Sequence, residues 1–324
     1  MPTSMNPNAV VECVPNFSEG TDEAKVAAIV AAMKVEGVRL LDWSLDGAHN
    51  RSVVTIAGTP AGVFESVVRG VGRAAQLIDL TRQKGEHPRI GAADVVPFVP
   101  VSGVSLAECA MMARQAGLEI WRRYGVPVYF YEAAAARPDR VNLEDVRRGQ
   151  FEGLLETAHR DAARRPDVGG PELHPTAGAS AVGARSFLIA YNIFMDTAKP
   201  TAGGRLPLAA QADIAAARAV ARSIRASAGG LHGVKAIGVS VNGRAQVSMN
   251  VTDFRSTPMA RVHDKVRDLA RTHGAVAAEG EIIGLIPQEA YDPHAEWLLE
   301  IPNFDPEAKV LERRLEHPLP WPAE

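Results

Sequence analysis

The densest group of side chains able to do chemistry lies in the segment Lys84–Gly91, which reads KGEHPRIG, and in Asp94 close behind it. The imidazole of His87 titrates near neutrality, so it suits proton transfer to or from nitrogen. Pro88 biases the backbone of His87 towards extended geometry and restricts how the ring is presented. The glutamate of this segment and Asp94 are placed to orient the ring, and its lysine and arginine are placed to hold a carboxylate. The spacing alone is equally consistent with a solvated turn.

A second polar cluster consists of Asp46, His49, Asn50 and Arg51. It falls in a predicted hairpin loop, where polar residues are expected without any function. We therefore favour the interpretation that this cluster is an ordinary polar loop over a functional role.

A third cluster lies in the Gly- and Pro-rich stretch Gly169–Gly178, with Glu172, His174 and Thr176 inside it and Arg185 beyond it. Small residues let backbone N–H groups approach a ligand closely, and surface loops between two units are common ligand sites. The stretch has neither a phosphate-loop lysine nor a dinucleotide fingerprint, so a nucleotide is not indicated.

Other chemistries have less support. His49, His87 and His174 could converge on a metal ion, but the sequence contains no HExxH motif and no paired His/Asp spacing on one helix, so no metal is expected. A serine nucleophile lacks its Gly-x-Ser-x-Gly turn. The two cysteines, Cys13 and Cys109, cannot form a thiolate zinc site alone and fit a reducing compartment.

Length and composition bound the class of protein. The 324 residues allow two domains or one large one, and 46% hydrophobic with 23% charged residues is ordinary for a globular protein. The net charge of 35 − 38 = −3 offers nothing to hold a nucleic acid or an anionic membrane. The apolar run Ala27–Met33 is too short to span a bilayer and no signal peptide is visible, so we expect a cytoplasmic protein.

The elements that must position these clusters follow the order strand, helix, strand, strand, helix, strand. In the first half the predicted elements are Val10–Val14, Thr21–Lys34, Val38–Trp43, Arg51–Ala57, a helix beginning at Pro60, and Val95–Val101. Pro97 and Pro100 favour an edge or irregular position for the last strand.

The second half repeats this order. Its predicted elements are Phe187–Ile193, Leu208–Ala226, Lys235–Val241, Ala245–Val251, Pro258–His273 and Glu281–Ile286. Two such units imply an α/β (α+β) fold of two ferredoxin-like βαββαβ subdomains in tandem, each with two helices against one face of an antiparallel sheet. We place the boundary in the Pro/Gly-rich stretch, giving subdomains 1–177 and 178–324, and expect both sheets to face a shared groove.

Six segments along the chain carry recognisable motifs: Val11–Gly20 (VECVPNFSEG), Asn50–Val53 (NRSV), Lys84–Asp94 (KGEHPRIGAAD), Val126–Tyr131 (VPVYFY), Gly183–Asn192 (GARSFLIAYN) and Ala245–Phe254 (AQVSMNVTDF). Together they resemble the formiminotransferase domain of glutamate formimidoyltransferase and of the bifunctional formiminotransferase-cyclodeaminase. They run in order from Val11 to about Pro287. The first and third are long, specific motifs.

The resemblance implies transfer of a formimidoyl group between N-formimidoyl-L-glutamate and N5 of tetrahydrofolate, which is a co-substrate. It assigns the general acid/base role to His87. The folate-contacting loop maps to ten residues: Gly169, Gly170, Pro171, Glu172, Leu173, His174, Pro175, Thr176, Ala177 and Gly178. This loop departs from the bulkier, tryptophan-containing loop of the animal enzymes. We expect it to be mobile without folate, because Pro and Gly dominate it and little apolar area anchors it.

Several further residues are expected to bind the substrates. Arg51, Arg89 and Arg185 are candidate clamps for carboxylates, Asn16, Asn50 and Asn192 are candidates for the polar edge of the pterin, and Asp94 completes the set. The chain ends near residue 324, so it is expected to lack a cyclodeaminase domain and to work with a separate deaminase, as a homodimer. Two alternatives stay open: a metal-dependent formiminoglutamate hydrolase, and a non-catalytic ligand-binding module.

Overall fold

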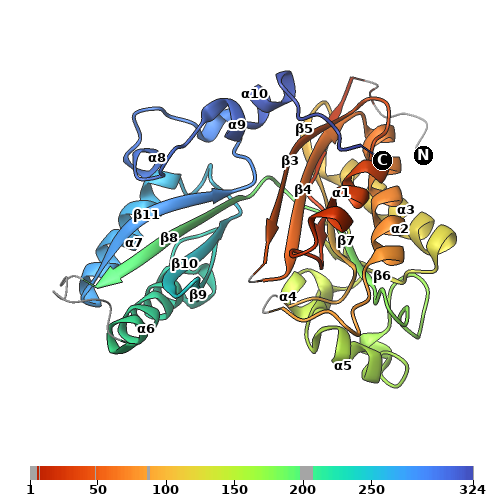
Figure 1. Cartoon of the computed structure of the whole chain (residues 1–324), viewed down its shortest axis with the longest axis horizontal. Coiled ribbons are helices and arrows are strands. Elements are labelled where there is room, and N and C mark those ends of the chain that lie inside the picture. The colour runs from red at the N-terminus through yellow and green to blue at the C-terminus, as the bar shows by residue number, and fades with distance from the viewer. Residues whose placement is uncertain (1–5, 7, 48, 86–87, 198–206, 324) are drawn as a thin grey trace. The chain divides into compact units, whose positions relative to one another are not determined.

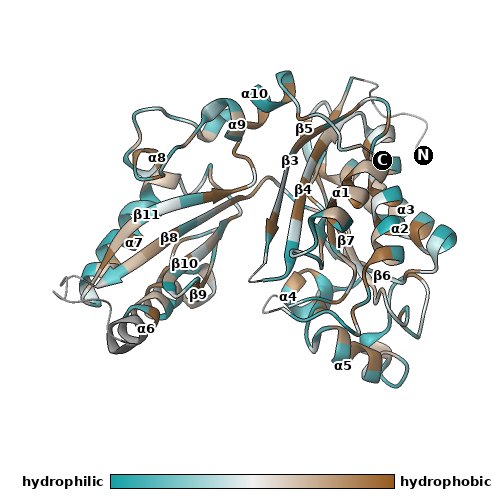
Figure 2. Cartoon of the chain, in the orientation of Figure 1, coloured by the Kyte–Doolittle hydropathy of each residue, from teal (hydrophilic) through white to brown (hydrophobic). Residues whose placement is uncertain are grey.

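The computed structural model describes residues 6, 8–47, 49–85, 88–197 and 207–323. Contacts divide the chain into two compact units (Figure 1). Unit 1 comprises Met1–Ser186 and Pro318–Glu324, and unit 2 comprises Phe187–His317. Each unit has its own hydrophobic core. In Figure 2 apolar and polar stretches adjoin on the helices of both units, as expected of helices with one buried side.

Unit 1 contains one mixed sheet and the helices that cover it. Its strands are β1 (Val10–Cys13), β2 (Asn16–Phe17), β3 (Val38–Asp46), β4 (Arg51–Gly58), β5 (Ala93–Ser102), β6 (Val128–Glu132) and β7 (Ser180–Ala184). Its helices are α1 (Glu23–Ala32), α2 (Pro60–Leu77), α3 (Leu106–Tyr124), α4 (Leu143–Val146) and α5 (Gln150–Thr157), with 3-10 turns at Pro138–Arg140 and Ala162–Arg164.

Local sequence explains where the long helices begin and end. The Thr59 hydroxyl accepts from Gly62 N ahead of Pro60 at the start of α2. Helix α3 opens with a capping box between Ser105 and Glu108 and ends at Gly125, which adopts the left-handed conformation. The buried faces of both helices consist mostly of apolar residues, with glycine, alanine and valine prominent among them.

The strand order confirms the duplicated fold class. In unit 1, β5, β1, β4 and β3 are neighbours in that order and all pair antiparallel. In unit 2, the order is β11, β8, β10 and β9, again all antiparallel. In each unit the last strand of the βαββαβ series therefore pairs with the first, and the third pairs with both the first and the second.

Unit 2 keeps to this plan. Its elements are β8 (Ile189–Thr197), α6 (Pro207–Ile224), a 3-10 turn Ala226–Ala228, β9 (Val234–Val241), β10 (Arg244–Val251), α7 (Met259–Thr272), β11 (Ala275–Ile283), a 3-10 turn Gln288–Ala290, α8 (Glu296–Leu299), α9 (Pro306–Lys309) and α10 (Leu311–Glu316). The last strand begins earlier than the predicted Glu281, because the β11–β8 pairing extends across an irregularity between Ala277 and Gly280.

Unit 1 contains elements that the predicted plan lacks: a further helix and two strands that extend its sheet. Helix α3 leads to β6, and β7 inserts between β5 and β6, parallel to both. Strand β5 is therefore not an edge strand, although irregularities in its pairing with β1 and β2 agree with its prolines. Residues 143–165 form short helices, of which α4 and α5 are separated by Gly149, which adopts a positive φ.

The division between the units lies later than the boundary expected at 177/178. Strand β7 belongs to the sheet of unit 1, so contacts place Ser186 in the first unit and Phe187 in the second. The tail also returns to unit 1, where Leu319 N donates to Leu40 O at 2.8 Å. None of the helices in the described parts of the chain is long and apolar enough to cross a membrane.

Candidate active site

Four strand ends bring the sequence motifs together in unit 1. Strand β2 pairs with β4 and with β5. Strands β5 and β7 are parallel neighbours, so the segments that precede them meet at the same end of the sheet. These preceding segments are the KGEHPRIG segment and the Gly169–Gly178 loop, which the sequence predicts to be catalytic and folate-binding.

His87 itself lies outside the described residues, but both flanks of its segment are described. Arg89 is buried, and its guanidinium donates to Gln83 O at 3.0 Å and to the Glu152 carboxylate at 2.9 Å. These contacts make Arg89 a holder of the segment that carries His87. Its predicted role as a carboxylate clamp stays a prediction.

Asn50 holds the same segment from the other side. Its side-chain Nδ2 donates to Lys84 O at 2.7 Å, while Oδ1 accepts from Gly20 N at 2.9 Å. Gln83 Nε2 donates to the backbone oxygen of Asn50 at 2.9 Å. Asn50 thus connects three of the motifs that resemble the family. It adopts a positive φ of 49°, and its hydrogen bonds fix the position of the Lys84 end of the His87 segment.

Backbone hydrogen bonds join the predicted folate loop to the residues that flank the His87 segment. Leu80 N donates to Thr176 O at 2.8 Å, and Ala92 N donates to Ala177 O at 2.9 Å. Gly178, at φ 68°, has no room for a side chain, because a Cβ atom there would lie 2.1 Å from Ile90 O. Two segments about 90 residues apart in sequence are therefore held together by their backbones.

The expectation that little apolar area anchors this loop is wrong for its second half. Leu173 and Ala177 are buried in the core of unit 1. His174 and Gly178 exchange two backbone hydrogen bonds of 2.9 Å across a tight turn. The first half, from Gly169 to Glu172, is more exposed.

Amide hydrogen exchange should therefore differ between the two halves of the loop. We expect the amides of His174 and Gly178 to exchange slowly with and without tetrahydrofolate, because both are hydrogen-bonded. The amides of Gly170 and Glu172 should exchange fast alone and at least several-fold more slowly with folate. Equal rates for Gly170 and Glu172 in both states would remove folate binding from this loop.

His174 stabilises the turn through its neutral ring. Its Nδ1 accepts from Ala177 N at 3.0 Å, which a protonated Nδ1 cannot do. Burial lowers the pKa of His174 below its usual 6.5. A lowered pKa in the folded protein means that this contribution is fully present above pH 6.5 and is lost as the pH falls through the folded pKa.

We therefore expect the protection factor of the Ala177 amide to fall as the pH is lowered from 7.5 to 5. His174→Gln should remove most of this pH dependence, since the amide oxygen accepts at either pH. Exchange measured by NMR and corrected for the intrinsic rate checks this. A protection factor that is constant with pH in the unmodified chain would show that the ring does not hold the turn.

Two arginines and a buried carboxylate lie near the start of β4. The Asp94 carboxylate is ion-paired with Arg147 and also accepts from Ile90 N at 2.7 Å. Burial, and after it the positive charge of Arg147, lower the pKa of Arg51, while the carboxylates of Asp46 and Asp94 act in the opposite direction. A guanidinium can hold a carboxylate through two parallel hydrogen bonds, so Arg51 and Arg147 are a candidate carboxylate site.

The sequence gives no signal for Arg147. It lies in a charged segment, 53 residues from the Asp94 that it contacts, and arginines in such segments are ordinarily solvated. Asp94 is predicted to orient the ring of His87, and this stays a prediction; its two oxygens contact Arg147 and the backbone N of Ile90. Asp46 is likewise engaged, because its carboxylate lies 2.6 Å from His49 Nδ1.

Of the remaining predicted residues, Asn16 adjoins this group and two others do not. Asn16 lies in β2 opposite Val53 of β4 and Val95 of β5, and its Nδ2 donates to Val14 O at 3.0 Å. Arg185 follows β7 at the opposite end from the loop, where its backbone N donates to Phe98 O. Asn192 belongs to unit 2, where its Nδ2 donates to Glu281 Oε1 at 3.0 Å.

One group of described residues has the donor types of a metal site, and it lies in unit 2. His263, Asp264 and Glu296 have ligand atoms within 4.8 Å of one another. Arg267 already lies 2.9 Å from Glu296 and therefore supplies a cation to this acidic group. The described residues near the His87 segment form no such cluster.

Comparison with known proteins places both units in one family. The formiminotransferase domain, N-terminal subdomain, matches residues 10–185, and the formiminotransferase domain matches residues 190–313. These matches meet at the division that the contacts define.

Similar proteins agree over nearly the whole chain. It is 41% identical over 310 residues to the glutamate formimidoyltransferase of Streptococcus pyogenes serotype M1, covering 94% of this chain and 98% of that protein. It is 39% identical over 312 residues to the glutamate formimidoyltransferase of Thermoplasma acidophilum, with 95% and 98% covered. The formimidoyltransferase-cyclodeaminase of Gallus gallus is 36% identical over 90% of this chain and 52% of that protein. With both family domains matched along its length, the chain belongs to the formiminotransferase family.

Proposed function

We propose that the protein is a glutamate formimidoyltransferase, which transfers the formimidoyl group between N-formimidoyl-L-glutamate and tetrahydrofolate. The observation that carries this proposal is the backbone bonding of the Gly169–Gly178 loop to Leu80 and Ala92, which lie on either side of the segment that contains His87 in the sequence. This bonding holds the proposed folate loop against the described flanks of that segment. The names of the similar proteins support the choice of substrates.

The reaction needs one proton to be removed and one to be supplied. N5 of tetrahydrofolate attacks the amidine carbon, and a tetrahedral intermediate forms as the new C–N bond is made. The attacking nitrogen then loses a proton, and the glutamate nitrogen leaves with one as the old C–N bond breaks. The imidazole of His87 can accept the first proton and donate the second, so no net proton is needed.

Positioning supplies much of the remaining rate. Two substrates held in a reactive geometry behave as if present at effective concentrations of about 10⁵ M or more. Arg51 and Arg147 are proposed to hold a carboxylate of formimidoylglutamate, because a guanidinium can hold a carboxylate through two parallel hydrogen bonds. Tetrahydrofolate is proposed to bind at Gly169–Gly178 as the co-substrate.

Omitting tetrahydrofolate tests the proposal against the alternatives. A transferase releases glutamate from N-formimidoyl-L-glutamate only when tetrahydrofolate is present, with one formimidoyl group transferred per glutamate. A hydrolase releases glutamate without folate, and a binding module releases none in either case. Activity that is abolished by a chelator and restored by a metal ion would contradict the proton-transfer mechanism.

A further inference from the structure

His263 is a buried polar residue of unit 2, and one of its two ring nitrogens makes no hydrogen bond. It lies on α7, is 1% exposed, and its Nδ1 is 3.0 Å from the hydroxyl of Tyr191 in the core. Its Nε2 is buried and has no hydrogen-bond partner among the residues that the structure describes. A buried polar atom in this state is costly, so its presence requires an explanation.

A carboxylate oxygen in the same state faces this nitrogen. Glu300 Oε2 is buried, has no hydrogen-bond partner in the described parts of the chain, and lies 3.4 Å from His263 Nε2. If the proton of the neutral ring is on Nδ1, then Nε2 and Oε2 are two acceptors turned toward each other. If the proton is on Nε2, the N–H still makes no hydrogen bond to Glu300. A metal cation held by both atoms would satisfy both.

The separation of the two atoms is that of two ligands of one metal ion. Zinc binds imidazole nitrogen at about 2.0–2.1 Å and carboxylate oxygen at about 2.0–2.2 Å, so two such ligands at a tetrahedral angle are about 3.3–3.5 Å apart. The distance of 3.4 Å from His263 Nε2 to Glu300 Oε2 falls in this range. A charge-assisted hydrogen bond would bring the two atoms to about 2.7–2.9 Å. The Tyr191 hydroxyl on Nδ1 is the outer hydrogen bond that metal-binding histidines ordinarily make.

Two more carboxylates adjoin His263. The ligand atoms of His263, Asp264 and Glu296 lie within 4.8 Å of one another. Asp264 and Glu296 are exposed, so their side chains can rotate toward an ion, and the ion can enter from solvent. Arg267 Nη1 lies 2.9 Å from Glu296 Oε2 and 3.6 Å from Glu300 Oε1. The three carboxylates and this guanidinium leave the cluster with a net charge of −2, which one divalent cation balances.

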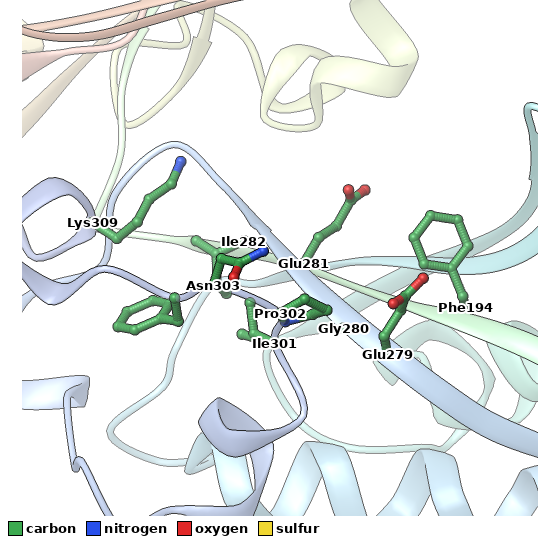
Figure 3. Close-up of a pocket in the computed structure, with 10 residues that line it drawn as sticks. Phe194, Glu279, Gly280, Glu281, Ile282, Ile301, Pro302, Asn303 and Lys309 are labelled. Atoms are coloured by element: carbon green, nitrogen blue, oxygen red, sulfur yellow. The ribbon is translucent and has the colours of Figure 1, made fainter.

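An ion at this position would join α7 to the segment that follows β11. Glu296 lies on α8 and Glu300 comes directly after it, where the Glu300 backbone oxygen accepts from Gly280 N of β11 at 3.0 Å. Residues 301–304, next along the chain, line a depression of about 340 Å³ together with part of β11 (Figure 3). Binding through Glu300 would therefore fix the segment that forms one wall of this depression.

We propose that this cluster binds one divalent ion of the zinc class through four ligands: His263 Nε2, Glu300 Oε2 and one oxygen each of Asp264 and Glu296. The imidazole nitrogen favours such an ion over Mg²⁺ and Ca²⁺, which prefer oxygen ligands alone. The ion is structural, because four protein ligands complete a tetrahedral site. None of these residues is proposed to touch either substrate, so this inference does not depend on the proposed function.

Calorimetric titration of the full chain with ZnCl₂, after treatment with a chelator and removal of the chelator, tests this. One zinc ion should bind per chain with a Kd of about 1 μM or below, and Ca²⁺ should bind at least about 100-fold more weakly. His263→Gln and Glu300→Gln should each weaken zinc binding at least about 10-fold, since each removes a ligand. Glu300→Gln keeps the size of the side chain, so it decides the test if His263→Gln fails to fold.

His232→Gln is the matched control, because His232 and Asp253 form an exposed histidine–carboxylate pair in the same unit, with 3.6 Å between Nε2 and Oδ2. It should leave the zinc affinity unchanged. Free zinc at about 100 times its Kd should raise the Tm of the unmodified chain by several degrees, and Glu300→Gln should abolish most of this rise.

Two results would overturn the proposal. One is the absence of zinc binding at concentrations up to about 100 μM, roughly 100 times the expected Kd. The other is zinc binding that neither His263→Gln nor Glu300→Gln weakens, which would be an adventitious ion only, held by surface side chains. Chelation should leave the folate-dependent transfer activity in place well below the Tm, so failure of the transfer assay and failure of zinc binding are separate results.

Discussion

Replacing His87 by alanine should lower the turnover number by about 10²–10⁴-fold, the usual loss when a general acid/base is removed. His87 is the residue of the best-matched motif that can both accept and donate a proton near pH 7. Affinity for tetrahydrofolate should stay within a few-fold, because the loop at Gly169–Gly178 is held by its own backbone bonds. Steady-state kinetics with both substrates measures the change.

The exposed His294 provides a control, and His294→Ala should leave turnover unchanged. Added imidazole should restore part of the activity of the His87→Ala chain, which a merely structural role would not allow. Near-normal turnover in His87→Ala would show that another group moves the protons.

Replacing Arg51 by methionine should raise the KM for N-formimidoyl-L-glutamate about 10- to 100-fold, the expected loss of a hydrogen bond to a charged group. The change in kcat and in the KM for tetrahydrofolate should be smaller, since Arg51 is proposed to hold the other substrate. Methionine keeps much of the side-chain length, and Asp94 keeps its ion pair with Arg147.

Arg148→Met is the matched control, because the Arg148 side chain is 76% exposed and pairs with Asp145. It removes the same charge from the neighbourhood without removing a group proposed to bind substrate. If Arg51→Met and Arg148→Met gave the same small increase in the KM for N-formimidoyl-L-glutamate, Arg51 would not bind the substrate directly, and only the positive charge of this region would matter.

The sequence predicts the repeated fold because the hydrophobic periodicity of a helix or strand can be recognised within a short stretch of neighbouring residues. All six predicted elements of the first half and five of the six in the second match observed elements, and the Asn242-Gly243 turn joins β9 to β10 as expected. The added strands of unit 1 escaped prediction for a topological reason. Strand β7 is five small and apolar residues, and only its position between β5 and β6 makes it part of the first sheet.

The parts of the candidate site that lie in recognisable sequence motifs were predictable. The KGEHPRIG segment, Asn50 and the Gly169–Gly178 loop are brought together by the ends of β2, β4, β5 and β7. The contacts within this group were not predictable. Whether Asn50 binds a ligand or holds a loop depends on which backbone groups face its amide, and sequence spacing carries no information about that.

Arg147 and Glu300 illustrate the same limit. Each is an ordinary charged residue in the sequence, and each gains a specific role only from a distant partner, Asp94 for the first and His263 for the second. Pairwise contacts across strands and between loops are set by tertiary packing.

The fate of the one-carbon group tests the central claim most directly. N-formimidoyl-L-glutamate carrying ¹³C in the formimidoyl group is incubated with the purified chain and tetrahydrofolate, and the label is followed by NMR. We expect the label to move to N5 of tetrahydrofolate as an equal amount of L-glutamate appears, and to stay on the substrate when folate is omitted. Label appearing in formamide or formate, with or without folate, would contradict transfer to folate.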